Sequence, residues 1–336
     1  MNSTPSPNPY ESIEMIPSYM DFEFQFNEIT AVIIISLSYN IPCTLVFLKT
    51  LFFYMQNRKA IQKSGLRVEI FQAFILMQLF NLFLIISEFL QFRIPFTGLV
   101  TRFCASENPK TLLKLISFFN YFTLYSSQLL TVLFCALRVA ILFSMSESTT
   151  RLVKTVFLIS YGTIFLIGFV SSLPHYLSEG VCVQMMNPFP FGSIIVVDHF
   201  SIKSSNVTIE NMVFISFVCV AIVILKIFMF RKLRQRKTLD SNSQKTITQN
   251  ANIEKTLTRT MIILLIPLLF LLVLAVSLLC KIYISAPSLL SLILMLRPVL
   301  LDLRVHTVTL YFYFTHPIFS NAKITTKVVG SQSVKL

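Results

Sequence analysis

Long uncharged apolar runs constrain this chain more than any other feature of its sequence. A helix needs about 20 apolar residues to cross the hydrocarbon core of a bilayer, and Ile29–Leu48 is a run of 20 residues without one charged side chain. Only 13% of the 336 residues are charged and 54% are hydrophobic, whereas about 25% are charged in a typical soluble domain. These figures exclude a soluble globular enzyme and a disordered chain, and they predict a polytopic membrane protein.

Seven runs of this kind predict an all-α membrane protein, a bundle of seven transmembrane helices. A bacterial-type β-barrel would instead show short alternating segments rich in Gly, but this chain has only 7 Gly and its apolar runs are unbroken. The bundle is expected to occupy residues 29–316, between an acidic N-terminal tail at 1–28 and a C-terminal tail at 317–336. The seven helices are expected at approximately residues 29–54, 68–92, 111–141, 153–177, 209–232, 259–282 and 288–314.

The distribution of basic residues predicts the orientation of the bundle, because Lys and Arg are retained on the cytoplasmic side of a membrane. Twenty of them fall in the loops and tail that share a side with the C-terminus, and six, Arg93 among them, fall in the opposite loops. We therefore expect the N-terminus outside and the C-terminus inside. The net charge of +13 then follows from topology, and no nucleic-acid partner is expected.

Two further features fit the side that is expected to be extracellular. Residues 1–28 lack the basic and apolar regions of a cleavable signal peptide, so the first helix is expected to act as an uncleaved signal. Asn2 and Asn206 each begin an Asn-x-Ser/Thr triplet on this side, and we expect both as glycosylation sites.

The six cysteines divide by compartment. Four lie within predicted helices, where cysteine is usually a small buried apolar residue. Cys104 and Cys182 lie in the first and second outer loops, an oxidising compartment in which a disulfide can form. Such a bridge would hold the second outer loop over the mouth of the bundle, and the alternative is two unpaired thiols.

Seven helices, an outside N-terminus and a bridge from the start of the third helix together resemble a G-protein-coupled receptor. The sequence departs from the rhodopsin-like pattern at three places. It contains no Trp, it has Leu137-Arg138-Val139 in place of Asp-Arg-Tyr, and it lacks Asn-Pro-x-x-Tyr in the seventh helix.

Five segments instead resemble the nematode serpentine chemoreceptors of the Srg superfamily, class U most closely and class gamma next. They are Tyr39-Asn40-Ile41-Pro42, Pro95–Ser106, Cys135-Ala136-Leu137-Arg138, Pro188–Ile194, and the seventh-helix pattern from Arg297-Pro298 to Phe319. The resemblance covers about residues 20–320. It implies a chemosensory receptor in the plasma membrane of sensory neurons, which binds a small extracellular chemical and signals through a heterotrimeric G protein.

The seventh predicted helix carries four ionisable side chains, which are costly in hydrocarbon unless they are paired or hydrated. At about 100° per residue, Arg297 and Arg304 fall on one side of the helix, and Asp302 and His306 fall on roughly the opposite side. Either a proline distorts this helix or the two pairs meet different neighbours. Glu88 is the leading partner for Arg297, as a fixed ion pair, a ligand contact or part of an activation switch.

Two residues are expected to act at the cytoplasmic side. Arg138 ends the third helix, where it either snorkels to the headgroups or latches a G protein or the chain's own loop. Pro267 lies in the inner half of the sixth helix and is a candidate pivot, because proline removes one backbone hydrogen bond.

The third predicted helix also carries the candidate ligand pocket. Pockets between helices have mostly apolar and aromatic walls with a few convergent polar groups. The residues that fit this description are Asn120, Tyr121, Tyr125 and Gln128. The alternative for all four is packing within a Phe-rich core.

No catalytic constellation is present in the sequence. The four His residues are scattered, and the chain lacks His-Glu-x-x-His, a phosphate-binding Gly loop and Gly-x-Ser-x-Gly. We therefore expect no enzyme activity, no cofactor and no metal site. The alternative function is a seven-helix ion channel or transporter subunit. The seven-helix insect odorant channels have the N-terminus inside, whereas the basic residues of this chain predict it outside.

Overall fold

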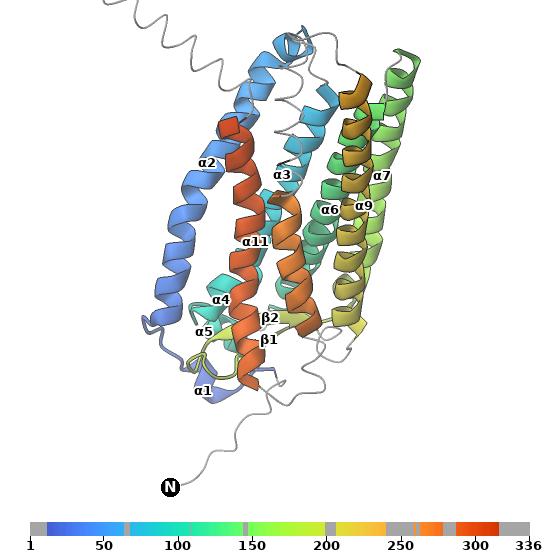
Figure 1. The fold of residues 1–336 in the computed structure, drawn as a ribbon. Coiled ribbons are helices and arrows are strands. Elements are labelled where there is room, and N and C mark those ends of the chain that lie inside the picture. The colour runs from blue at the N-terminus through green and yellow to red at the C-terminus, as the bar shows by residue number, and fades with distance from the viewer. Residues whose placement is uncertain are drawn as a thin grey trace, which may run out of the picture.

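A bundle of long helices forms the body of the molecule. The computed structural model describes residues 12–63, 68–107, 109–143, 147–198, 206–239, 259, 263–277 and 287–315. Within these residues the long helices are α2 (Glu28–Lys63), α3 (Val68–Glu88), α6 (Lys110–Phe143), α7 (Glu147–Leu177), α9 (Asn206–Leu239) and α11 (Pro287–Thr315). They run side by side with roughly parallel axes, and a shorter apolar helix, Ile263–Ser277, lies among them (Figure 1).

Several short elements gather at one end of the bundle, at the bottom of Figure 1. They are α1 (Pro17–Met20), the π-helical turn η1 (Phe89–Arg93), α4 (Ile94–Phe96), α5 (Thr101–Ser106), β1 (Gly180–Gln184) and β2 (Ile194–Asp198). We call this end the hairpin end, because β1 and β2 form an antiparallel pair with Cys182 opposite Val196.

The β-hairpin corrects the expectation of an all-α chain. Each strand has five residues, and β2 reads Ile-Ile-Val-Val-Asp. β-branched residues favour a pleated strand, and five residues are too few to cross a membrane. The fold is therefore mostly helical, with a small two-stranded sheet at the hairpin end.

Five helical segments among the described residues are long and apolar enough to cross a membrane. They are Glu28–Asn57, Ile70–Phe96, Lys110–Ala140, Thr155–Leu177 and Ile209–Lys232. The second continues past the expected boundary at residue 92, through η1 and α4. α9 extends to Leu239, so the basic run at 231–237 continues a helix and does not lie in a loop. α11 has 29 residues, about 44 Å of helix.

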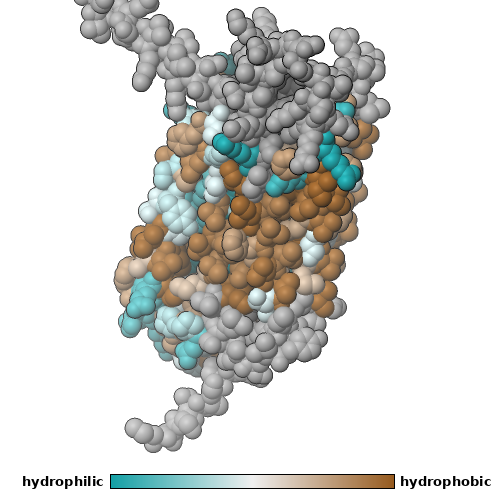
Figure 2. Space-filling view, in the orientation of Figure 1, coloured by the Kyte–Doolittle hydropathy of each residue, from teal (hydrophilic) through white to brown (hydrophobic). Residues whose placement is uncertain are grey.

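Aromatic side chains fill the centre of the bundle. Phe74 stacks on Phe312 with ring centres 3.9 Å apart, and Phe71 packs edge-on against Phe312 at 5.5 Å. The outside of the bundle is apolar as well. Leu158 is 73% exposed and Ile159 is 63% exposed, and Figure 2 shows a brown band across the middle of the visible face. A surface this apolar is typical of helices that face lipid.

α6 and α7 approach each other closely at a glycine. A Cβ added to Gly168 of α7 would overlap Ser126 Oγ of α6, whereas one added to Gly162 of the same helix would meet nothing within 4 Å. Small residues at helix contacts let the two backbones come together in a membrane. Gly168 therefore sets the distance between α6 and α7.

Candidate functional site

The four ionisable residues of α11 lie within ten positions and point to different neighbours. Arg297 and Arg304 contact α3 and α6, while Asp302 and His306 contact α2 and η1. α11 is helical through Pro298. Of the two arrangements that the sequence allows, the structure therefore has the one in which the pairs meet different helices.

The first of these contacts along α11 joins this helix to α3. Arg297 Nη2 donates to Glu88 Oε1 at 2.9 Å. The Glu88 side chain is 0% exposed and that of Arg297 is 24% exposed. The guanidinium also lies 4.8 Å from the centre of the Phe92 ring. The structure thus places in direct contact the two residues that the sequence suggested as partners.

Asp302 forms a bidentate pair with Arg93. Arg93 Nη2 donates to Asp302 Oδ1 at 2.6 Å, and Nη1 donates to Oδ2 at 2.9 Å. The side chains are 3% and 2% exposed. The assignment of Arg93 to an outer loop was wrong, because the second span continues past Glu88 to Phe96. Residues 89–96 contain no charge other than Arg93. This uninterrupted stretch is the sequence signal that could have placed Arg93 within the span.

Three side chains of α2 complete this arrangement. Tyr39 Oη donates to Asp302 Oδ2, and Asn40 Nδ2 donates to the same oxygen at 3.1 Å. Ser36 Oγ accepts from Arg93 Nη1. We call these five residues the Asp302 cluster. A buried ion pair is tolerated where further hydrogen bonds satisfy its remaining atoms, and the cluster supplies them to the carboxylate.

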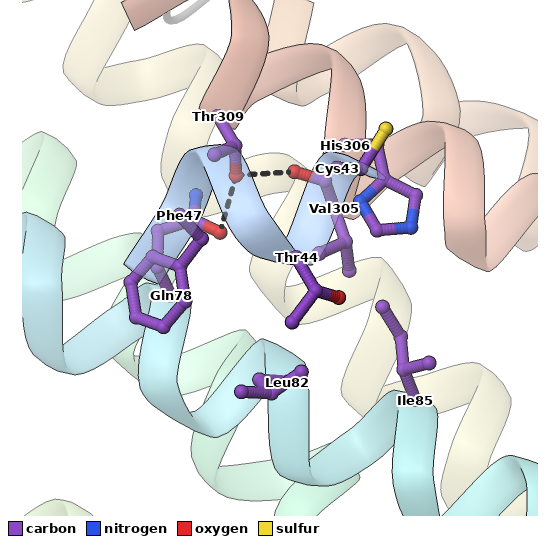
Figure 3. A pocket seen from close by; sticks show the side chains of 9 residues that line it. All are labelled: Cys43, Thr44, Phe47, Gln78, Leu82, Ile85, Val305, His306 and Thr309. Atoms are coloured by element: carbon purple, nitrogen blue, oxygen red, sulfur yellow. Dashed lines mark hydrogen bonds between the residues drawn. The ribbon is translucent and has the colours of Figure 1, made fainter. Parts of the chain in front are cut away.

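His306 lies one turn further along α11, where its Nε2 contacts Asn40 Oδ1. It borders a small cavity between α2, α3 and α11, whose volume is about 10 Å³. Figure 3 shows the lining side chains converging from the three helices, with Thr309 Oγ1 lying 3.0 Å from Gln78 Oε1 and from the Val305 carbonyl oxygen. Since a cavity needs a volume of about 10–15 Å³ to hold one water, this one has room for a single water.

Arg304 faces hydroxyl groups of α6 instead of a carboxylate. Its Nη2 donates to Ser127 Oγ and to Thr131 Oγ1, each at 3.1 Å, and the residue is 1% exposed. Its Nε and Nη1 atoms have no hydrogen-bond partner among the residues that the structure describes. A buried cation held only by hydroxyls is costly inside a membrane, which makes Arg304 a functional candidate.

Arg138 is enclosed by protein at the end of the bundle opposite the hairpin. It is 1% exposed, and its guanidinium carbon lies 3.9 Å from the centre of the Phe134 ring. The interpretation that it snorkels to the headgroups is therefore wrong for this structure. Arg138 instead packs on Phe134 inside the bundle, where a cation over an aromatic face is attracted by the ring.

The polar residues expected to form a ligand pocket on α6 are buried. Asn120 is 0% exposed and accepts a hydrogen bond from Ser87 Oγ of α3 at 2.9 Å. Gln128 is 1% exposed. Neither residue borders the cavity at His306 or a second one between α2 and α11. Both are packed between helices.

The two tyrosines of the same set make contacts that the sequence did not indicate. The Tyr121 ring stacks on the His175 ring with centres 3.5 Å apart. His175 Nδ1 lies 2.9 Å from Asp198 Oδ2, and both side chains are 0% exposed. Tyr125 Oη donates to Asn211 Oδ1 at 3.1 Å. These contacts tie α6, α7, α9 and β2 together.

A disulfide holds the hairpin against the bundle. It joins Cys104 of α5 to Cys182 of β1, with the two Cα atoms 6.2 Å apart. The N-terminal segment packs on the same bridge. The Ile13 amide donates to the Cys182 carbonyl at 3.0 Å, and the Met15 amide donates to the Ala105 carbonyl at 3.1 Å. The segment therefore forms one unit with α5 and β1, which we call the cap.

Aromatic contacts close the cap. Tyr19 is 2% exposed, its ring stacks on Phe191 at 4.7 Å, and burial raises the pKa of its phenol. Gly192 has φ +88°, a conformation that L side chains rarely adopt, and the Phe22 ring occupies the place of its missing Cβ. A glycine is required at this position for both reasons.

Comparison with known proteins decides the family. A family model described as the serpentine type 7TM GPCR chemoreceptor Sru matches residues 13–322. The chain belongs to the Sru family. Serpentine receptor class U-26 of Caenorhabditis elegans is 23% identical over 186 residues, which are 55% of this chain and 63% of that receptor. The match thus covers less than two thirds of the relative.

The remaining expected sites of this Sru chain are placed as follows. Pro267 lies within the helix Ile263–Ser277, which continues through it. Asn206 is the first residue of α9, while Asn2 and the tail at 317–336 lie outside the described residues. Within the part of the chain that the structure describes, no three His, Cys, Asp or Glu side chains are grouped to hold a metal.

Proposed function

We propose that this Sru chain is a chemosensory receptor of the Srg superfamily, with seven spans, in the plasma membrane of sensory neurons. It binds a small extracellular chemical at the hairpin end and activates a heterotrimeric G protein at the opposite end. The Cys104–Cys182 bridge supports an extracellular hairpin end, because disulfides form in oxidising compartments. The excess of basic residues on the C-terminal side supports the same orientation.

The observation that carries the proposal is the distribution of contacts along α11. Its ionisable residues contact α3, η1, α2 and α6 in turn. Because such contacts in a water-poor bundle are either made or broken, α11 moves by exchanging partners and not by small continuous shifts. A ligand that favours one set of partners over the other shifts the population between two bundle arrangements.

The end of the bundle opposite the hairpin contacts the G protein. Arg138 is held over Phe134 in the structure, and we assign this contact to the resting arrangement. Release of the guanidinium would present it to a G protein. Pro267 lacks an amide hydrogen, so the helix that contains it bends there most easily, and it serves as the pivot that opens the cytoplasmic face.

The test is G-protein activation in cells that carry the whole chain. Cells with a panel of Gα subunits are exposed to small extracellular chemicals, and dissociation of Gα from Gβγ is followed by energy transfer. The expected result is a chemical whose effect needs the chain and is lost in Arg138→Met but kept in the exposed control Arg102→Met. A chemical-evoked membrane current that persists after G proteins are inactivated would overturn the proposal in favour of a channel.

A further inference from the structure

The π turn η1 lies between two residues that both bind charged side chains of α11. Glu88 ends α3 and contacts Arg297. Arg93 ends η1 and contacts Asp302. In a regular helix, at about 100° per residue, side chains five positions apart point about 140° away from each other. These two side chains nevertheless reach the same helix.

The hydrogen bonding of η1 explains how both contacts are made. The Ile94 amide donates to the carbonyl of Phe89, five residues earlier, whereas an α-helix bonds residues four apart. A π turn thus holds one residue more than an α-helical turn, and such turns are frequent at functional sites. The additional residue brings Arg93 round to the side of Glu88, so the two contacts with α11 depend on it.

The same turn is bonded to the β-hairpin. Gln91 Nε2 donates to the Val196 carbonyl of β2 at 3.1 Å, and Gln91 is 1% exposed. Val196 is paired with Cys182 of β1, which the disulfide joins to Cys104. η1 therefore contacts the hairpin through Gln91 and α11 through Arg93, two residues further along.

Conversion of η1 to a regular α-helical turn would break one of the two contacts with α11. Glu88 would stay at Arg297, because α3 before it is unchanged. Arg93 would then point about 140° away from Glu88 and lose Asp302. Gln91 turns together with Arg93 and leaves β2 in the same step. The hydrogen bond from Gln91 to the hairpin therefore stabilises the π turn, and a displacement of β2 removes that stabilisation.

The segment that follows η1 can take up the additional residue. α4 would turn with η1, and residues 97–100 form a turn between α4 and α5. Gly98 in this turn has φ +83°, a conformation that glycine adopts readily. Leu99 is 62% exposed, so movement of its side chain breaks little packing. The rearrangement can thus end before α5 and the disulfide.

We propose that η1 couples the β-hairpin to α11 by changing between a π turn, in which Arg93 is paired with Asp302, and a regular α-helical turn, in which this pair is broken. Displacement of β2 by a ligand at the hairpin end favours the second form. The coupling rests on the proposed function for the ligand and the G protein, but the change in η1 itself does not depend on either.

Single deletions test whether the π turn contains one removable residue. Deletion of Leu90, which is 43% exposed, leaves Glu88 and Arg93 four positions apart, or about 40° in a regular helix. Both contacts with α11 should persist, so the full chain in lipid nanodiscs should melt close to the unchanged chain. Deletion of Ile86 on α3, which is 45% exposed, instead turns Glu88 by about 100° and should lower the melting temperature. Equal losses for the two deletions would overturn the proposal.

The exchange itself is measured on the Arg93 side chain. The full chain in nanodiscs carries isotopically labelled arginine, and Arg93→Lys identifies the NMR signal of the Arg93 Nε atom. Relaxation dispersion detects exchange on the microsecond to millisecond timescale. We expect such exchange in the unchanged chain and its loss after deletion of Leu90. An unchanged chain without dispersion at Arg93, or a deletion variant that keeps it, would contradict the two forms of η1.

Gln91→Leu tests the link to the hairpin. Loss of one hydrogen bond should raise the population of the broken pair about two- to tenfold, and cells with this variant should activate the G protein without any chemical. Gln25→Leu makes the same change at an exposed position and should alter neither result. If Gln91→Leu leaves the exchange at Arg93 unchanged, η1 is not coupled to the hairpin.

The coupling and the proposed function fail in different ways. Exchange at Arg93 that responds to Gln91→Leu, in a chain that never activates a G protein, keeps the coupling and removes the proposed function. Activation by a chemical that is the same with and without Leu90 keeps the function and removes the coupling.

Discussion

Arg297 and Arg304 lie on the same side of the same helix, yet their surroundings have opposite energetic consequences. Arg297 neutralises a fully buried carboxylate, Glu88. Arg304 has hydroxyl partners, and two of its nitrogens have none among the described residues. Removing one partner of a buried ion pair leaves an uncompensated charge. Removing a cation that has no counter-ion among the described residues removes the charge itself.

The same substitution should therefore change stability in opposite directions. Arg297→Met should lower the free energy of unfolding by about 3–5 kcal/mol. Arg304→Met should raise it, because a single cation at the centre of a membrane helix costs about 2.5–3.5 kcal/mol. Thermal unfolding of the purified chain in one detergent measures both. We expect the Arg304→Met protein to be delivered to the cell surface but impaired in G-protein activation.

Glu88→Gln supplies the control for this pair of changes. Combined with Arg297→Met it removes the stranded charge, so the double variant should melt above the Arg297→Met single variant. Equal melting temperatures for the two would show that the pair contributes nothing. A fall in melting temperature with Arg304→Met would show that a counter-ion neutralises Arg304 in the folded chain.

For single residues, the sequence predicted which charged side chains lie within the bundle better than it predicted the residues that they contact. Glu88 and Arg297 could be paired because each interrupts an apolar run and a charge in hydrocarbon needs a partner. Arg93 was missed because the expected helix ends at residue 92, although uncharged residues continue on both sides of Arg93. The π-turn at Phe89–Arg93, which keeps this residue inside the bundle, has no sequence signature.

Among the elements, α6 makes the most extensive contacts, and its contact with α7 depends on Gly168. Gly168→Leu should lower the melting temperature, because overpacking a well-packed contact costs about 1–3 kcal/mol and Ser126 occupies the space. Gly162→Leu, six residues earlier on the same helix, should raise it slightly, since Leu favours a helix by about 0.8–1 kcal/mol over Gly and nothing lies near. Melting curves that fall equally for both variants would show that Gly168 has no special role.

Elements with long apolar runs were predictable, and elements of the cap were not. The helix expected at 288–314 lies within α11 despite its charges, because its apolar neighbours are continuous. The hairpin was missed, since its strands have five residues each and short apolar runs carry no period that separates strand from loop. The docking of Ile13 on β1 and of Met15 on α5 depends on residues far away in the chain.

For the whole molecule the orientation in the membrane is the first thing to test. Asn206 and Arg234 lie on α9, separated by about 42 Å of helix, which exceeds the hydrocarbon core of about 30 Å. An epitope tag inserted next to Asn206 should therefore be stained on intact cells, and one next to Arg234 only after permeabilisation. The reverse pattern would place the N-terminus inside and favour the channel alternative.

The Cys104–Cys182 bridge should act on the whole molecule through loop closure. It spans a sequence separation of 78 residues, and in the chain-entropy model such a loop is worth about 4 kcal/mol. Cys104→Ser and Cys182→Ser should reduce surface delivery equally, and the double change should be no worse than either. A silent Cys182→Ser beside a harmful Cys104→Ser would mean that Cys104 serves only packing. Cys43→Ser, at a free cysteine, is the control.

The docking of the N-terminal segment on α5 and β1 also fixes an order of events during synthesis. Ile13 is made before its partner, because the carbonyl that accepts its amide hydrogen belongs to Cys182, 169 residues later in the chain. At about 5–20 residues per second the segment waits on the order of ten seconds or more for its partner to be translated. Four of the long helices, α2, α3, α6 and α7, precede Cys182 in the chain. The first described segment to be made therefore reaches its place only after these four helices have been made.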